Sequence, residues 1–355
     1  MSRITILGAG AWGTALAINL AYRRESSGQD SQSGRASHSG RASHDVTLWT
    51  RLPQAAQSMR DRRENLLYLP NFPLPEDLQI TADPQEAIHQ AEIIVSVTPS
   101  EYLRATYNQF ASLLTQGQVI VSATKGIEDT THLRMSEVIQ QALSAHNLNL
   151  PVAVLSGPSF AQEVAANAPT ALTIASTDNA LATRIQKEFS GQTLRLYTNE
   201  DVIGVELGGA LKNVIAIASG VVAGLNLGHN TAAALITRGI AEITRLALAC
   251  GGRRETLAGL SGVGDLVLTC TGSLSRNRTV GQALGEGRSL PEILESLGGK
   301  VAEGVFTTKA ALGLARRHNI EMPITEQMEL ILNEGKDPRE AIKDLMLRPG
   351  KHEQH

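Results

Sequence analysis

The chain has 355 residues, of which 42% are hydrophobic and 19% charged, and its formal net charge is −3. This length is typical of two domains, and the composition is that of a globular protein with a sizeable core in each. The small negative charge, without any block of basic residues, argues against nucleic acid as a partner. Cys250 and Cys270 lie too far apart for a CxxC motif. We expect two small buried thiols in a reducing compartment rather than a disulfide.

The N-terminal residues lead straight into a predicted strand without a secretory signal pattern, so we expect a cytoplasmic protein. The most apolar stretch, 202–227, is long enough to span a bilayer, but it is interrupted by Glu206 and Lys212 and is rich in Gly and Ala. We interpret it as a buried core helix and predict no membrane span.

Short β-branched runs alternate with amphipathic stretches through the first half of the chain. The alternation predicts an α/β domain with a Rossmann-like, doubly wound sheet. The runs are apolar at their centres, as expected for parallel strands that are covered on both faces. Helices are predicted between them, for example at 12–22 and 101–114. The predicted strands are 3–7, 45–49, 92–97, 118–122 and 152–155, with 171–175 and 193–197 as further strands.

After about Asn199 the pattern becomes helical, which predicts an all-α C-terminal domain. We place a dinucleotide-binding domain at 1–199, a helical substrate and catalytic domain at 200–345, and a polar tail at 346–355. The predicted helices of the second domain are 200–223, 230–250, 276–286, 303–318 and 324–334.

Residues 25–44 are polar, and within them the sequence SGRASH at 33–38 is repeated at once at 39–44. The segment has no apolar period and cannot pack. We interpret it as a loop insertion between the first helix and the second strand. Because it carries Arg and His, the alternative is a phosphate-binding or regulatory loop.

The first strand ends in the sequence GAGAWG at 8–13. Gly8 allows a tight turn, Gly10 lets the backbone approach a pyrophosphate, and Gly13 lets the helix pack closely on the strand. The helix N-terminus would then face the phosphates. Since the motif joins a strand to a helix, we interpret it as a dinucleotide site rather than an ordinary glycine turn.

The end of the second strand bears on which cofactor fits. A strict NAD enzyme usually has Asp or Glu there, whereas this chain has Trp-Thr-Arg at 49–51. Arg51 could meet a 2′-phosphate or stack on adenine, unless it is an ordinary surface arginine. We expect NADP or NAD as cofactor, with NADPH favoured.

Further chemical groups follow two later strands and lie within one helix. Lys125, after the strand at 118–122, and the sequence GPSFA at 157–161 stand where open α/β sheets bind ligands, although either could be an ordinary loop. Lys212 lies inside the apolar helix, where a lysine without a partner would have a lowered pKa suited to acid–base work on a carbonyl. The alternative is a pair with a core carboxylate such as Glu206.

Asp265 precedes by ten residues the sequence SRNR at 275–278, at a predicted helix start. Ser, Arg and Asn at a helix N-terminus make a small anion site in which Arg can grip a phosphate. The alternative is a helix cap with surface arginines. We expect no metal site.

Taken in order, these motifs closely resemble the bacterial-type NAD(P)-dependent glycerol-3-phosphate dehydrogenases over nearly the whole chain. The resemblance implies reversible reduction of dihydroxyacetone phosphate to sn-glycerol 3-phosphate, which feeds phospholipid synthesis, and it suggests a homodimer. The matching motifs are GAGAWG at 8–13, ATKG at 123–126, SGPSFA at 156–161, ELGGALKN at 206–213, GDLVLTC at 264–270, SRNR at 275–278 and VAEG at 301–304.

The resemblance also implies roles for individual residues. Lys212 matches the catalytic lysine, and we expect Lys125 to stabilise the developing alkoxide beside it. Position 11 is Ala where many members have Ser, and position 51 is Arg where others have His. The cofactor-binding residues expected from the turn and the family pattern are Gly8, Gly10, Ala11, Trp12, Gly13, Arg51, Lys125, Ala161, Arg276, Val301 and Glu303. The expected substrate-binding residues are Lys125, Gly157, Ser159, Lys212, Asp265, Ser275, Arg276 and Asn277.

Two alternatives stay open from the residues. One is a reductase of the same two-domain plan that acts on 3-hydroxy acids, 6-phosphogluconate or imines, although the anion site at 275–277 argues against substrates without phosphate. The other is a sensor that binds NAD(P)H without catalysis, which would not need Lys125, Lys212 and Asp265 together.

Overall fold

The computed structural model describes residues 2–21, 44–297, 302–350 and 352–353, which form two compact units. The sheet unit comprises Met1–Thr124, Ser136–Leu155 and Ser159–Glu200. The helical unit comprises Lys125–Met135, Ser156–Pro158 and Asp201–His355. Of the predicted insertion 25–44 only His44 lies among the described residues, and the expected cofactor contact Val301 lies outside them.

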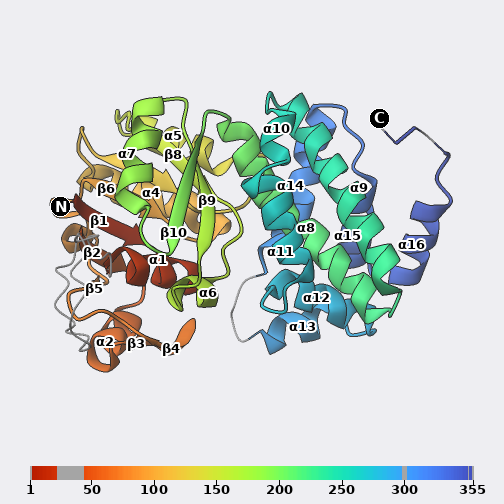
Figure 1. Cartoon of the computed structure of the whole chain (residues 1–355), viewed down its shortest axis with the longest axis horizontal. Helices are drawn as coiled ribbons and strands as arrows, with labels where there is room; N and C mark the ends of the chain where they lie inside the picture. Colours follow the sequence, from red (N-terminus) through yellow and green to blue (C-terminus); the bar gives the residue numbers. More distant parts are fainter. Residues whose placement is uncertain (1, 22–43, 298–301, 351, 354–355) are drawn as a thin grey trace, which may run out of the picture. The chain divides into compact units, whose positions relative to one another are not determined.

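The sheet unit contains an eight-stranded sheet in the order β10-β9-β8-β7-β6-β1-β2-β5, with helices around it (Figure 1). Pairing is parallel from β8 through β7, β6, β1 and β2 to β5, and also between β9 and β10. The chain leaves β1 toward β2 and later returns to its other side at β6, so the direction of winding changes next to β1. This arrangement confirms the predicted Rossmann-like fold. The strands are β1 Ser2–Leu7, β2 His44–Trp49, β5 Gln79–Thr81, β6 Ile93–Ser96, β7 Val119–Ser122, β8 Val152–Ser156, β9 Thr170–Ala175 and β10 Leu194–Asn199, with a separate two-stranded pair, β3 Glu64–Asn65 and β4 Leu69–Pro73.

The helices of this unit differ from the prediction mainly between β6 and β7. The helix expected at 101–114 is broken into two 3₁₀ turns, Ser100–Tyr102 and Ala111–Leu113, on either side of a shorter α4. The α-helices are α1 Ala11–Ala21, α2 Pro53–Arg62, α3 Pro84–Ile88, α4 Leu103–Phe110, α5 Met135–Ser144, α6 Ala161–Ala165 and α7 Asn179–Phe189.

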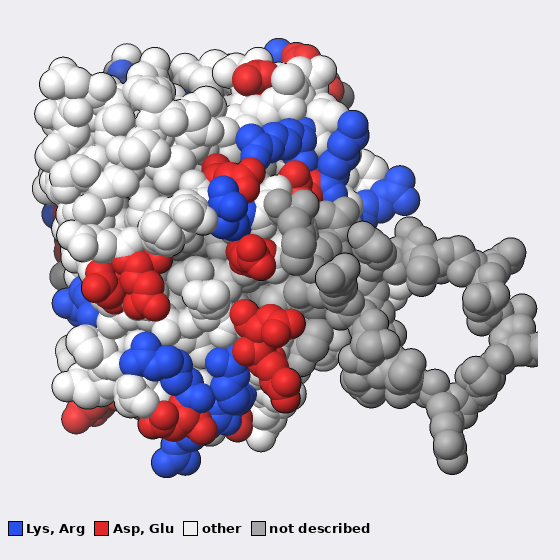
Figure 2. All heavy atoms as spheres, turned by 90° about the vertical axis from the view of Figure 1, so that its left-hand side faces the viewer, with Lys and Arg blue, Asp and Glu red and all other residues white. Residues whose placement is uncertain are grey.

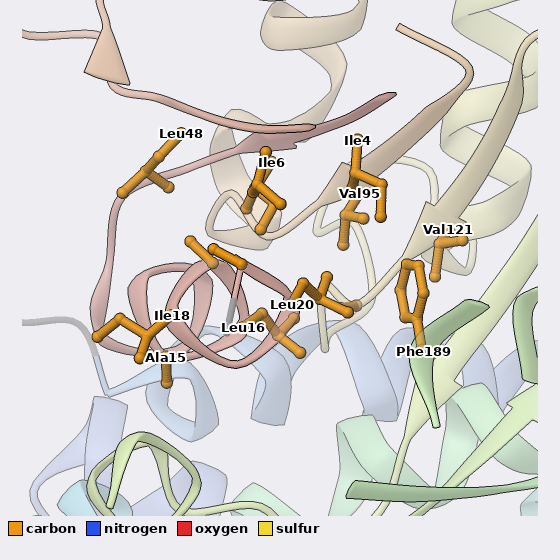
Figure 3. Packing of buried hydrophobic residues seen from close by; sticks show 14 of the residues in the cluster. Ile4, Ile6, Ala15, Leu16, Ile18, Leu20, Leu48, Val95, Val121 and Phe189 are labelled. Carbon is orange, nitrogen blue, oxygen red and sulfur yellow. The ribbon is translucent and has the colours of Figure 1, made fainter. Parts of the chain in front are cut away.

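The core of the sheet unit lies between the strands and helices α1, α6 and α7. Figure 3 shows Ile6 from β1 and Leu16 from α1 directed into one layer, with Phe189 of α7 beside Val121 of β7. All four side chains are at most 1% exposed. Because burial of each such side chain contributes about 1.5–3 kcal/mol, this layer fixes α1, and with it the glycine turn, on the strand that precedes it.

The helical unit is built around α8 (Val202–Gly224), against which α9, α11, α12 and α14 pack. A Cβ at Gly281 would lie 1.8 Å from the Ile217 carbonyl oxygen, so α12 can approach α8 only because this position is glycine. The helices are α9 Gly228–Ala249, α10 Arg254–Leu257, α11 Asp265–Thr271, α12 Arg276–Gly285, α13 Leu290–Ser296, α14 Glu303–Arg317, α15 Pro323–Glu334 and α16 Pro338–Met346, with a π-helical turn at Leu260–Gly264.

By length and hydropathy α8 could cross a membrane, but 89% of its apolar window is buried inside the structure. The prediction of a buried core helix is therefore confirmed. A second candidate arises only if 254–271 and 276–285, which are bent by 49°, are counted as one span.

On the face shown in Figure 2, basic and acidic side chains lie close to one another, as the small net charge leads us to expect. Cys250 and Cys270 are both thiols; Cys270 is buried as expected, whereas Cys250 is half-buried.

Candidate active site

The glycine turn between β1 and α1 has the geometry that a dinucleotide phosphate requires. Gly8 has φ +121°, a conformation that favours glycine, and a Cβ there would lie 2.9 Å from Val97 backbone atoms. A Cβ at Gly13 would lie 1.9 Å from the Gly8 carbonyl oxygen. At Gly10, by contrast, no described atom lies within 4 Å of the Cβ position. The open side of Gly10 is therefore where a ligand can approach the backbone.

Asn65, a residue that the sequence analysis missed, restrains the backbone of this turn through hydrogen bonds. The buried side chain of Asn65, in the short strand β3, donates to the Ala9 carbonyl oxygen at 2.9 Å and to Thr14 Oγ1 at 2.8 Å. The first N–H groups of α1, which begins at Ala11, have no acceptors within the helix. Together with the helix dipole they suit a phosphate, so these residues fit a dinucleotide.

The two large side chains at the end of β2, those of Trp49 and Arg51, differ in burial. Trp49 is buried, donates from Nε1 to the Ala82 carbonyl oxygen at 3.2 Å, and packs edge-on against Phe110 with ring centroids 5.0 Å apart. Arg51 is exposed, and its guanidinium carbon lies 5.8 Å from the centroid of the Tyr102 ring, within cation–π range. Arg51 is thus the group here that can face a 2′-phosphate.

The helical unit brings two lysines to a single buried carboxylate. Lys212, on α8 and only 7% exposed, donates from Nζ to Asp265 Oδ1 and to Thr269 Oγ1, the latter at 2.9 Å. Lys125 Nζ donates to Asp265 Oδ2 at 2.6 Å and to the Gly157 carbonyl oxygen at 3.3 Å. Asp265 is fully buried. Two ammonium groups on one carboxylate leave a formal charge of +1, which suits an oxygen that gains negative charge.

This arrangement corrects one part of the prediction for Lys212 and confirms another. Lys212 is not without a partner, and its partner is Asp265 rather than Glu206, which pairs with Arg134 at 2.5 Å. The expected lowering is confirmed: burial, aided by repulsion from Lys125, lowers the pKa of Lys212 to about 8 although Asp265 opposes the shift. A lysine tuned to this value can exchange a proton near neutral pH.

Two adjacent glycines in α8 allow neighbouring segments of the helical unit to approach it closely. A Cβ at Gly208 would lie 2.5 Å from the Ser261 carbonyl oxygen, in the π-helical turn that precedes Asp265. A Cβ at Gly209 would lie 2.5 Å from Ser156 Oγ and 3.8 Å from Cδ of Lys125. Each glycine inside a helix costs about 1 kcal/mol relative to alanine. We interpret the cost as the condition for close approach of the turn that precedes Asp265 and of Ser156, whose neighbour Gly157 accepts from Lys125.

The predicted anion site begins α12. Ser275 is the N-cap and accepts from the Arg278 N–H at 3.2 Å, which agrees with the helix-cap alternative for this residue. Asn277 is buried, donates to Asn213 Oδ1 at 3.1 Å and accepts from the Gly304 N–H at 3.0 Å. Arg276, in contrast, is exposed. The structure thus orients Asn277 firmly and leaves the charge of Arg276 accessible.

The remaining expected site residues are distributed over both units. Gly157 belongs to the helical unit, whereas Ser159 and Ala161, which begins α6, belong to the sheet unit. Glu303 begins α14, and its carboxylate accepts from Asn213 Nδ2 at 3.4 Å. Among the described residues, no three His, Cys, Asp or Glu side chains are placed to hold a metal ion.

Thr269 and Asn213 were missed by the sequence analysis. Thr269 lies four residues after Asp265, one turn further along α11, so helical spacing could have found it. Asn213 directly follows Lys212, but its hydrogen bonds to 277 and 303 join parts of the chain that sequence spacing cannot relate.

A phosphate-binding turn on a parallel sheet, together with a buried lysine of lowered pKa in a helical unit, defines a dehydrogenase of the nicotinamide class. Comparison with known families is more specific. The N-terminal model of the NAD-dependent glycerol-3-phosphate dehydrogenases matches residues 3–182, and the C-terminal model matches 201–343. The chain belongs to the family of NAD-dependent glycerol-3-phosphate dehydrogenases.

Individual relatives agree with this assignment. The chain is 58% identical to glycerol-3-phosphate dehydrogenase [NAD(P)+] of Acidobacterium capsulatum, over 99% of this chain and 100% of the relative. It is 54% identical to the protein of the same name from Koribacter versatilis, over 98% of each. The crystal structure of glycerol-3-phosphate dehydrogenase from Coxiella burnetii is similar with a TM-score of 0.88 and 40% identity, over 98% of this chain and 99% of that one.

Two glycine substitutions test the turn. Gly13→Ala places a Cβ against the Gly8 carbonyl oxygen, so we expect a loss of roughly 1–3 kcal/mol of folding free energy, measured by thermal or denaturant unfolding. Gly10→Ala is the matched control: its Cβ meets no described atom, so the unfolding midpoint should hold while the Kd for NADPH rises. Equal cofactor affinity in Gly10→Ala and wild type would contradict the assignment of the phosphate site.

Proposed function

We propose that this chain catalyses the reversible, NAD(P)H-dependent reduction of dihydroxyacetone phosphate to sn-glycerol 3-phosphate. The observation that carries the proposal is the cluster of Lys125, Asp265 and Lys212 within one unit of a chain that belongs to the glycerol-3-phosphate dehydrogenase family. Acid–base chemistry on a ketone needs a proton donor and a stabiliser of negative oxygen, and the two lysines supply one each.

The nicotinamide, when bound, supplies the hydride. In the reductive direction the ammonium of Lys212 donates a proton to the carbonyl oxygen as that oxygen becomes an alkoxide. Lys125 stabilises the same oxygen by its charge, and Asp265 holds both amines in position. In the oxidative direction neutral Lys212 takes the hydroxyl proton. The hydrogen bond from Lys212 to Thr269 Oγ1 fixes the direction of the amine.

The phosphate of the substrate is assigned to the start of α12. Arg276 is exposed and can bind it through two N–H groups, while Asn277 is fixed by its bonds to Asn213 and Gly304 and retains a second amide hydrogen. Ser275, Gly157 and Ser159 complete the assigned substrate residues. Binding of the phosphate at a distance from the reacting carbon orients that carbon and so contributes to turnover.

The cofactor is assigned to the glycine turn, with Ala11 and Trp12 at the start of α1, and to Arg51. NAD and NADP are the cofactors of the family, and we propose that NADPH is favoured because exposed Arg51 replaces the usual acidic residue. Lys125, Ala161, Arg276, Val301 and Glu303 are the further proposed cofactor contacts. We also propose a cytoplasmic homodimer that supplies phospholipid synthesis, as the family resemblance suggests.

The decisive assay follows NADPH and NADH oxidation with dihydroxyacetone phosphate and, separately, with dihydroxyacetone. We expect rapid oxidation only with the phosphorylated ketone, and faster oxidation of NADPH than of NADH at low cofactor concentration. Lys212→Ala should lower kcat by about 10²–10⁴-fold, the usual contribution of a general acid, while NADPH still binds. No consumption with dihydroxyacetone phosphate would overturn the proposed function and favour another substrate or a cofactor sensor.

The lowered pKa of Lys212 predicts the pH dependence of glycerol 3-phosphate oxidation. Only the neutral amine accepts a proton, so kcat/KM should rise with pH through about 8. In Lys125→Met the repulsion that helps to lower this pKa is removed, so the rising limb should move to higher pH. A limb that stays in place or moves to lower pH in Lys125→Met would contradict the coupling of the two lysines.

A further inference from the structure

Residues 125–135, here called the hook, fold with the helical unit although Thr124 before them and Ser136 after them belong to the sheet unit. The first residue of the hook is Lys125. Contacts between the hook and the helices of the helical unit must therefore hold Lys125 beside Asp265. The inference that follows rests on the proposed function, in which Lys125 stabilises the substrate oxygen.

The hook is closed by its own backbone. The Glu128 N–H donates to the Leu133 carbonyl oxygen at 3.0 Å, and the His132 N–H donates to the Glu128 carbonyl oxygen at 2.8 Å. Ile127 and Arg134 form an isolated antiparallel bridge. Because these bonds join both ends of the hook, a contact made at Arg134 also restrains the backbone near Lys125.

A buried ion pair fixes the closed hook to α8. Arg134 Nη1 lies 2.5 Å from Glu206 Oε2, and the two side chains are only 16% and 4% exposed. Ile127, 4% exposed, packs in the core cluster of the helical unit. Glu206 precedes Lys212 by six residues on α8, which is roughly 9 Å along the helix axis. The same helix thus carries the anchor of the hook and the proton donor.

Two exposed polar contacts between the hook and α14 are weaker anchors. Lys309 Nζ lies 3.3 Å from an Asp129 carboxylate oxygen, with side chains 67% and 50% exposed, and such solvent-screened surface pairs contribute little to stability. Arg317 donates to the Thr131 carbonyl oxygen at 2.7 Å in an exposed position. The buried pair of Arg134 and Glu206 is therefore a stronger restraint than either of these contacts with α14.

We propose that Arg134 and Glu206 are positioning residues for the reaction: their buried ion pair holds the hook on α8 so that the amine of Lys125 stays on Asp265 and beside Lys212. In consequence Lys125, Asp265 and Lys212 are assembled within the helical unit alone.

A double-mutant cycle tests this proposal. Arg134→Met with Glu206→Gln removes both charges at similar volume, so that no single charge is left buried. The pair variant is compared with wild type, and then again in the Lys125→Met background. If the pair acts through Lys125, kcat should fall by about tenfold or more where Lys125 is present, as expected for a misplaced catalytic group, and by less than about twofold where it is absent.

A second readout separates positioning from stability. The charged and titratable groups facing Lys212 are Lys125 from the hook and Asp265 and Cys270 from α11. If the hook is released, Lys125 no longer repels Lys212. The rise of kcat/KM for glycerol 3-phosphate oxidation should then occur at a higher pH in the pair variant than in wild type.

Glu242→Gln is the matched control. The buried Glu242 carboxylate accepts from the Ile324 and Thr325 N–H groups at the start of α15, so the variant should lose stability while the kcat of folded enzyme and the pH limb hold. A pair variant with unchanged kcat and pH limb, or one equally impaired without Lys125, would overturn the positioning role alone. An inactive wild type would instead overturn the proposed function, and this inference with it.

Discussion

One fully buried carboxylate shared by two ammonium groups is the interaction on which the helical unit depends. A charge taken from water costs several kcal/mol unless it is paired, so Lys212 can lie inside α8 only because Asp265 accepts from it. Asp265 in turn accepts from Lys125, and the second cation turns a neutral pair into a site of net positive charge. Burial lowers the pKa of Lys212, and repulsion from Lys125 adds to this effect. In the proposed reaction the excess positive charge stabilises the substrate oxygen.

Much of the surrounding structure is arranged around this interaction. The three groups come from segments distant in the sequence. Gly208 lets the π-helical turn at Leu260–Gly264 approach α8, and Gly209 lets Ser156 approach it, next to the Gly157 carbonyl oxygen that accepts from Lys125. The sheet unit performs a separate task, since its glycine turn and the start of α1 fit phosphates with backbone groups alone. In the proposed function, dinucleotide binding is assigned to the sheet unit and proton transfer to the helical unit.

The sequence predicted the features that have a local signature. Continuous β-branched runs located the main strands, and the strand–glycine–helix pattern located the phosphate turn, because both depend on neighbouring residues. The strands at 64–73 and 79–81 were missed because most are too short to show a period. The partner of Lys212 was missed for a different reason: Glu206 lies near it in sequence, whereas Asp265 reaches it only through the fold of the 260–264 turn. The change of unit at 124–125 has no sequence signal either.

The central claim is that Lys212 and Lys125 share Asp265, and that burial, aided by repulsion from Lys125, lowers the pKa of Lys212 to about 8. The most direct measurement is a pH titration of lysine side-chain resonances by NMR in isotopically labelled protein, with Lys212→Met to assign the signal. The account predicts one lysine that titrates at about 8, whose resonance is absent from Lys212→Met. A Lys212 resonance that titrates at the ordinary lysine value of 10.5 would contradict it.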